Sequence, residues 1–306
     1  MNRPLGAAAG ILLDRALGEP PATVPHPVAQ FGSFMLAVER RLWRDGATAR
    51  AAGVVHAAVG VGVGVGAGAA ARSTAATTYL AVAGRLLHRT ALDIAAALDS
   101  GDLDLARARL PALAGRDPSR LDEAGIVRAV VESVAENTVD AIVAPALWAA
   151  TLGGAGALGY RAVNTLDAMV GHRSARYERY GWASARLDDV GGWVPARVTA
   201  ALVGAVRPTA AADVWRTVRR DAPAHPSPNS GVAEAAFAAA LGIRLGGTNR
   251  YGERVEHRAG LGNGRPPDRP DVHRAVRLSR HVSLALAAVL AAAGSGLPAR
   301  KGIRPA

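Results

Sequence analysis

The feature that most constrains this chain is a run of 21 residues without a formal charge, AAGVVHAAVGVGVGVGAGAAA, at positions 51–71. About twenty uncharged, mostly apolar residues are long enough to cross a bilayer as a helix. Gly60, Gly64 and Gly68 recur every four residues, which on a helix gives one flat face that a second helix can approach closely. The alternation of valine and glycine also fits a strand, although so much glycine makes a poor one.

Three further apolar stretches follow, at 139–160, 190–206 and 281–297. Pro145 interrupts the first and Pro195 the second. Broken helices are tolerated at membrane depth where they line a cavity inside the protein. The pattern therefore predicts an all-α, polytopic helical membrane protein with four or five membrane segments, some broken by glycine or proline, and helical polar loops. It also predicts a single domain over residues 1–306, and a soluble, alanine-rich helical bundle is the alternative.

Composition excludes several kinds of chemistry. The 306 residues contain no cysteine, which rules out disulfides, iron–sulfur clusters and cysteine-based zinc sites. Lys301 is the only lysine, so the chain has no P-loop lysine, and a Schiff-base enzyme is improbable. The net charge of +11 comes from arginines that are scattered over the loops and alternate with acids, so we do not predict nucleic-acid binding. An anionic membrane surface explains the charge better.

Acidic residues follow one another along a predicted helix that leads into the stretch 139–160. Glu132, Glu136 and Asp140 are spaced four residues apart, so their carboxylates share one helix face and repel one another. A hard cation such as Mg²⁺ would remove this cost, and Arg128 one turn earlier would do part of the same work structurally. The pattern predicts a metal site.

Residues 160–189 mix arginines, acids, amides and aromatic rings. This composition is more typical of a surface that binds phosphates and rings than of a face that serves solubility, although single residues also fit ordinary ion pairs. The candidates here are Asn164, Asp167, His172, Arg173, Arg176, Arg186, Asp188 and Asp189.

Two proline-rich loops hold further candidates. His26 lies among four prolines near the N-terminus, where a plain helix stop is the simpler interpretation. His225 and Asn229 lie in a turn before a predicted helix at 232–241, whose first amide groups are able to hold an anion. The glycine-rich stretch 246–264 reads as a loop.

Long motifs carry a resemblance to a known family. VVESVAENTVDAIVAPALW, YRAVNTLDAMVGHRSARYERYGWASARLDD and RDAPAHPSPNSGVAEAAFAAALGIRLGG closely resemble the adenosylcobinamide-phosphate synthase family (CobD/CbiB) of cobalamin biosynthesis. LLDRALGEPPATVPHPV, GRDPSRLDEAGI and NRYGERVEHRAGLGNGRPPDRPDVHRAVRL also fit, so the resemblance spans nearly the whole chain. One departure is Val232-Ala233, where the family usually has Trp-Pro.

The resemblance implies a multi-pass enzyme of the cell membrane. It implies a ligase that joins a propionate carboxyl of adenosylcobyric acid to (R)-1-aminopropan-2-ol or its O-phosphate, forming an amide. ATP is the co-substrate, Mg²⁺ accompanies it, and other cobalamin-pathway enzymes are possible partners. The alternative is a non-catalytic corrinoid transporter or a membrane scaffold for those enzymes.

Roles follow as a hypothesis from this reaction. The metal-phosphate face comprises Glu132, Glu136 and Asp140, with Asn137 beside them, and Glu136 also counts among the catalytic residues. The phosphate-binding arginines are Arg173, Arg176 and Arg186. A second metal ligand or the base for the amine is Asp167, Asp188 or Asp189. The corrinoid or nucleotide contacts are His225 and Asn229, Asn164 is a further substrate- or phosphate-binding residue, and His172 and His26 are weaker candidates.

Overall fold

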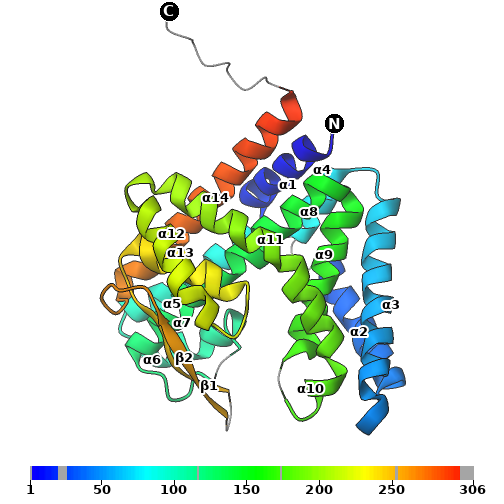
Figure 1. The fold of residues 1–306 in the computed structure, drawn as a ribbon, viewed down its shortest axis with the longest axis horizontal. Coiled ribbons are helices and arrows are strands. Elements are labelled where there is room, and N and C mark those ends of the chain that lie inside the picture. Colours follow the sequence, from blue (N-terminus) through cyan, green and yellow to red (C-terminus); the bar gives the residue numbers. More distant parts are fainter. Residues whose placement is uncertain (1, 20–25, 116, 173, 252–253, 297–306) are drawn as a thin grey trace, which may run out of the picture.

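The computed structural model describes residues 2–19, 26–115, 117–172, 174–251 and 254–296, and these residues are almost entirely helical (Figure 1). The predicted all-α class is confirmed. The α-helices are α1 (Arg3–Leu17), α2 (Pro27–Leu42), α3 (Ala49–Ala70), α4 (Thr74–Ala81), α5 (Gly84–Asp99), α6 (Leu103–Arg109), α7 (Glu123–Thr138), α8 (Ala144–Leu152), α9 (Gly154–Leu166), α10 (Tyr177–Tyr180), α11 (Trp182–Val206), α12 (Ala211–Asp221), α13 (Ser230–Leu241) and α14 (Arg269–Ser295). Two π-helical turns, η3 (Val139–Val143) and η4 (Asp167–Gly171), interrupt this series, and β1 (Leu245–Tyr251) pairs with β2 (Arg254–Leu261).

The helices pack through small residues. Figure 1 shows α3 beside α9 at one end of the molecule, with α6 and the hairpin at the other and α11 between them. Most of the buried core consists of alanine and valine, with Tyr180 and Phe237 as its largest fully buried side chains. Helix α13 is apolar on every side, and every residue of it except Ala239 is buried. Such a helix belongs at the centre of a bundle.

The predicted small-residue face of α3 is confirmed. A methyl group on Gly64 would overlap Ala162 of α9, and one on Gly68 would overlap the backbone of Gly154. Gly66 points the other way, where an added methyl group meets nothing within 4 Å. The glycines that recur every four residues therefore let α3 and α9 approach as closely as their backbones allow.

The two proline-containing stretches behave differently from each other. Residues 139–160 are broken, as predicted, into η3, α8 and α9, and Gly153 with φ 69° makes the break between the two α-helices. Residues 190–206, in contrast, stay within one α-helix, because α11 continues through Pro195. The predicted interruption there is wrong.

Tertiary hydrogen bonds explain how the backbone accommodates both prolines. Pro195 has no amide hydrogen to give to the carbonyl of Gly191, one turn earlier. The indole of Trp148 donates to that carbonyl instead, at 3.0 Å. Pro145 likewise frees the carbonyl of Ala141, which accepts the backbone N–H of Ala83 at 2.9 Å. Each proline thus ties its helix to a neighbouring segment.

The stretch 246–264, which we expected to be a loop, contains most of the β-hairpin. Its amino acids favour strands weakly, so the pairing depends on tertiary contacts. Leu245 and Leu261 face each other at the base of the hairpin and are fully buried. Gly246 and Gly247, with φ of 88° and 101°, form a bulge that residues with side chains rarely adopt.

Two described helices are long and apolar enough to cross a membrane. They are Gly46–Ala70, which includes α3, and α14. Helix α3 turns large apolar side chains outward, among them Val54, Val55 and Val63. About half of the most apolar part of α14 is buried inside the protein. The number of membrane segments beyond these two stays a prediction.

The packing of α3 yields a matched pair of variants. Gly68→Ala should lower the free energy of unfolding by about 1–3 kcal/mol, because its methyl group overlaps the Gly154 backbone and the helices must separate. Gly66→Ala should be neutral or stabilising by up to about 1 kcal/mol, because alanine favours the helix and the site is open. Thermal unfolding of the purified protein in detergent measures both, and equal midpoints would contradict the proposed contact.

Candidate functional site

Four carboxylates from separate segments lie close enough for their charges to act on one another, and each is half-buried. They are Glu136 on α7, Asp140 in η3, Asp167 in η4 and Asp188 on α11, called here the acidic cluster. The charges of Asp188, Glu136 and Asp167 all act on Asp140. Asp167 and Glu136 act on Asp188 in the same way. The fold therefore brings together two groups of acids that the sequence places in separate motifs.

The π-helical turns determine where two of these carboxylates lie. Asp140 lies in η3, which ends just before Pro145, the residue whose missing amide hydrogen disturbs the helical hydrogen bonds of this turn. Asp167 is the first residue of η4, which ends at Gly171. A side chain at Gly171 would overlap the carboxylate of Asp167. Single π-helical turns inside α-helices are often found at functional sites.

Neutral hydrogen-bond donors hold the cluster in place. Ser230, the first residue of α13, donates its hydroxyl to Oε1 of Glu136 at 2.7 Å. The amide of Asn164 donates to Oδ1 of Asp188 at 3.4 Å. Such donors orient a carboxylate without cancelling its charge.

Burial and mutual repulsion alter the acidity of the cluster. Burial, helped by the charges of Asp189 and Glu136, raises the pKa of Asp167 to about 6. Burial, with the charge of Asp167 next, raises the pKa of Asp188 to about 7. A carboxylate that titrates near neutral pH is suited to accept a proton in catalysis.

Glu132 serves the hairpin rather than the acidic cluster. It is 1% exposed, and its Oε1 accepts the backbone N–H of Gly246 at 2.9 Å, with Nε of Arg128 at 3.9 Å. Among the described residues, no three histidine or acidic side chains form a group that could hold a metal ion. The metal site predicted from Glu132, Glu136 and Asp140 thus stays a prediction, with Glu132 already engaged elsewhere.

Asn137 and Asp189 lie next to cluster residues in sequence but have structural partners of their own. The amide of Asn137 donates back to the carbonyl of Ser133 at 2.9 Å. Asp189 pairs with Arg186 at 3.0 Å on the exposed side of α11. Arg186 is therefore close in sequence to Asp188 but forms its ion pair with Asp189.

Arg176 and His172, the other predicted binding residues that the structure describes at 172–176, have partners outside the cluster. Arg176 pairs with the buried Glu39 at 3.0 Å and stacks 4.0 Å above the ring of Trp43. These contacts attach α10 to α2. His172 is exposed and packs edge-on against Tyr177, with ring centres 4.9 Å apart. Arg173 lies outside the described residues.

The loop before α13 joins the cluster to its surroundings. The amide of Asn229 donates to the backbone carbonyl of Asp189 at 2.9 Å, and its oxygen accepts from Arg197 at 3.4 Å. Asn229 therefore holds the start of α13 against α11, next to Ser230. The role of Asn229 as a ligand contact stays a prediction.

His225 lies deeper in the same loop. Its Nε2 is 3.6 Å from Glu234 and 3.4 Å from Nη1 of Arg258. Burial is the main cause that lowers the pKa of His225, and the charges of Glu136 and Glu132 act against it. This histidine therefore lies between the acidic cluster and the arginines of the hairpin.

His26 caps the start of α2 at some remove from these contacts. Its Nδ1 accepts the backbone N–H of Val28 at 3.2 Å, and Nε2 pairs with Glu19 at 2.6 Å.

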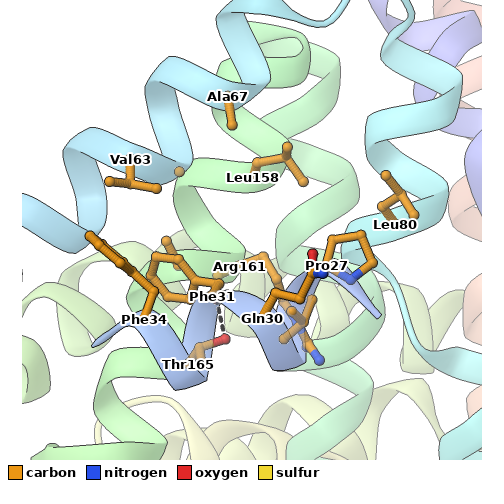
Figure 2. Close-up of a pocket in the computed structure, with 13 residues that line it drawn as sticks. Pro27, Gln30, Phe31, Phe34, Val63, Ala67, Leu80, Leu158, Arg161 and Thr165 are labelled. Carbon is orange, nitrogen blue, oxygen red and sulfur yellow. Dashed lines mark hydrogen bonds between the residues drawn. The ribbon is translucent and has the colours of Figure 1, made fainter. Parts of the chain in front are cut away.

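An apolar pocket of about 290 Å³ is lined by residues of α2, α3 and α9 (Figure 2). Phe31, Phe34 and Leu158 face it together with one charged lining residue, Arg161.

Sequence reasoning missed two residues that contact the cluster. Tyr160 donates its hydroxyl to Oδ1 of Asp140 at 3.3 Å, and Ser230 holds Glu136. Tyr160 ends an apolar stretch and Ser230 directly follows Asn229, so neither residue indicates a site by its type alone. A polar group directly beside a predicted site residue was the available signal.

Comparisons with known proteins agree with the sequence motifs. A family model described as "CobD/Cbib protein" matches residues 7–279. A protein of Mycobacterium tuberculosis named "Cobalamin biosynthesis protein CobD" is 48% identical over 303 residues, which cover 95% of each chain. Proteins of the same name from Chromobacterium violaceum and Rhodobacter capsulatus are 42% and 37% identical, and cover 96% and 95% of this chain and 97% of their own. No solved structure matches the chain.

The raised pKa of Asp188 makes stability depend on pH. A carboxyl with a raised pKa in the fold loses stabilising free energy as the pH rises through that value, about 7. In metal-free buffer at pH 8, Asp188→Asn should therefore raise the free energy of unfolding by roughly 2 kcal/mol, after allowance for solvent screening. At pH 5 the gain should be smaller, because the carboxyl is already ionised in the unfolded chain but still protonated in the fold, and it should vanish only below about pH 4. A gain of equal size at pH 8 and at pH 5 would refute this account.

Proposed function

The chain belongs to the CobD/CbiB family, and on this premise we propose that it is an enzyme of cobalamin biosynthesis. Its reaction is ATP-dependent formation of an amide between a propionate carboxyl of adenosylcobyric acid and (R)-1-aminopropan-2-ol or its O-phosphate. The observation that carries the proposal is the acidic cluster, in which four half-buried carboxylates from four segments lie within range of one another's charge.

The reaction needs an activated acyl group. A carboxylate is a poor acyl donor, so an oxygen of the propionate attacks the γ-phosphorus of ATP, and the bond to ADP breaks. The amine nitrogen then attacks the acyl carbon, phosphate leaves, and the nitrogen gives up a proton. The protein must bind the corrinoid carboxylate, ATP and the amine together. It must also offset the charge of the phosphates and accept the proton that the amine gives up.

The donor set of the cluster fits Mg²⁺. Half-exposed carboxylates that repel one another are held in place by neutral donors, such as Ser230 on Glu136, instead of by cations. Mg²⁺ takes one or two protein carboxylates together with phosphate oxygens and water, so Glu136 and Asp140 suffice as protein ligands. When bound, Mg²⁺ would neutralise the negative charge that develops on the phosphates.

Asp188 is the residue we assign as the base for the amine. Its pKa of about 7 allows it to be deprotonated at neutral pH and still to hold a proton well. The side-chain amide of Asn164 donates to one oxygen of Asp188 and so orients this carboxylate. Asp167, with a pKa of about 6, is the neighbouring group whose charge keeps the pKa of Asp188 high.

Membrane attachment is part of the same proposal. Helix α3 and helix α14 have the length and the apolar composition to cross a bilayer, and α3 carries outward-facing valines. We propose that they embed the protein in the cell membrane, with further segments at 139–160 and 190–206 beside them. Asp140 lies at the start of the first of these segments and Asp188 just before the second. A polar substrate would therefore reach the acidic cluster from the membrane edge.

Activity should depend on the cluster. Purified protein in detergent should convert adenosylcobyric acid, ATP and either amine into the amide, with one ADP released for each amide. Glu136→Gln and Asp188→Asn should each lower the rate at least about 100-fold, because a metal ligand or a base is lost. The matched controls Glu178→Gln and Asp213→Asn change exposed acids of α10 and α12 and should leave the rate unchanged.

The outcome discriminates between classes of function. Wild-type rates in both cluster variants would refute the assigned site. Corrinoid uptake into vesicles that contain the protein, without amide formation, would refute the ligase in favour of a transporter. Mass spectrometry of the corrinoid products and an ADP assay provide the two readouts.

Membrane embedding has a separate test. After cell lysis the protein should sediment with the membranes and stay there in alkaline carbonate, because apolar helices in a bilayer do not dissolve in water. Detergent should release it. Recovery in the soluble fraction would contradict the membrane part of the proposal without touching the acidic cluster.

A further inference from the structure

A polar cavity of about 450 Å³ lies between the start of α7 and the β-hairpin. Three arginines from three segments line it: Arg128 on α7, Arg244 just before β1 and Arg258 on β2. We call this cavity the arginine pocket. Much of the remaining wall is glycine, which leaves the space between the arginines free of other side chains.

Arg128 is held rigidly at this wall. Its Nη1 donates to the carbonyl of Gly246 at 2.6 Å, and its Nη2 donates to the carbonyl of Thr248 at 2.8 Å. A side chain on Gly247 would collide with the guanidinium of Arg128. The unusual backbone of this glycine pair thus makes room for a fixed positive charge. A charge fixed in advance binds an anion without a further entropy cost.

Arg258 and Arg244 complete the positive lining. Arg258 is mostly buried, with 16% of its side chain exposed, and it lies 3.9 Å from Glu234. Arg244 is exposed at the edge of the cavity. The acid that lines the cavity, Asp122, accepts the backbone N–H of Gly125 at 2.8 Å as the cap of α7.

The balance of charge on the lining favours an anion. Among the described lining residues, three arginines stand against one carboxylate, and the acids near two of these arginines, Glu132 and Glu234, are buried and do not line the cavity. The planar guanidinium matches the geometry of phosphate oxygens. The α7 helix also begins at this cavity and adds its positive end.

The size and the position of the pocket narrow the choice of anion. A cavity of this volume is larger than one phosphate needs and is within the range of small-molecule sites. Nη1 of Arg258 is 3.4 Å from His225, and the charge of Glu136 in the acidic cluster acts on the same histidine. The pocket therefore adjoins the acidic cluster through one side chain.

We propose that the arginine pocket binds the phosphate chain of a nucleoside triphosphate. Arg128 and Arg258 hold the inner part of the chain, and Arg244 closes over it from the edge. The identification of the nucleotide as the ATP of amide synthesis rests on the proposed function. The affinity for a chain of phosphates does not depend on it, because the lining alone supplies the charge.

Binding of inorganic tripolyphosphate tests the pocket directly. Calorimetry on the full chain in detergent should show tripolyphosphate binding more tightly than orthophosphate and weakening as salt is raised. Arg244→Gln and Arg258→Gln should each weaken it about tenfold, because one charge-assisted contact is lost. Arg216→Gln, which changes an exposed arginine of α12, is the matched control and should bind as the wild type does.

Each outcome supports or overturns the assignment. Tripolyphosphate affinity that is unchanged in Arg244→Gln and Arg258→Gln, in variants whose thermal unfolding matches the wild type, would overturn it. Orthophosphate binding as tightly as tripolyphosphate would also overturn it. Wild-type KM for ATP in Arg244→Gln would overturn its role in amide synthesis. Tripolyphosphate binding that depends on these arginines, in a protein without ligase activity, would keep the pocket and refute the proposed function.

Discussion

The site depends on the repulsion between carboxylates that the fold holds close together. Burial raises the pKa of Asp167 and of Asp188, and the charges of neighbouring acids, Glu136 among them, raise it further. Such an arrangement is maintained only if the surrounding helices do not yield. The small-residue packing of α3 on α9, with Gly68 against Gly154, provides a rigid frame for the α9 end of the cluster. Alanine-rich helices that touch through their backbones have little room in which to relax.

Sequence patterns predicted the features that depend on local chemistry. The glycine face of α3 follows from spacing alone, and the break near Gly153 follows from a residue that accepts positive φ. Within the site, Glu136, Asp140, Asp167 and Asp188 were all singled out before their proximity was known. Pairing across the fold was the part that spacing does not encode.

Tertiary contacts that spacing does not encode give several predicted residues other partners. Glu132 has the spacing of a metal ligand, yet the backbone of Gly246 reaches it first. Arg176 has the charge of a phosphate ligand, yet Glu39 and Trp43 hold it. Pro195 has the chemistry of a helix breaker, yet Trp148 satisfies the carbonyl that it frees. The hairpin was not predicted because its contacts come from Arg128 on another helix and from two buried leucines, Leu245 and Leu261. Only the leucines give a local signal in the sequence, and that signal is weak.

The acidic cluster and the arginine pocket are complementary in charge, and His225 joins them. The cluster lacks cations among its hydrogen-bond donors, and the pocket presents more guanidinium groups than carboxylates. A phosphate chain that carries a divalent cation satisfies both at once, because its oxygens meet arginine while its metal meets carboxylate. We propose that this pairing takes the place of a P-loop lysine, since Lys301 is the only lysine of the chain. It also gives the loop from His225 to Ser230 a purpose, since that loop contacts Arg258 at one end and Glu136 at the other.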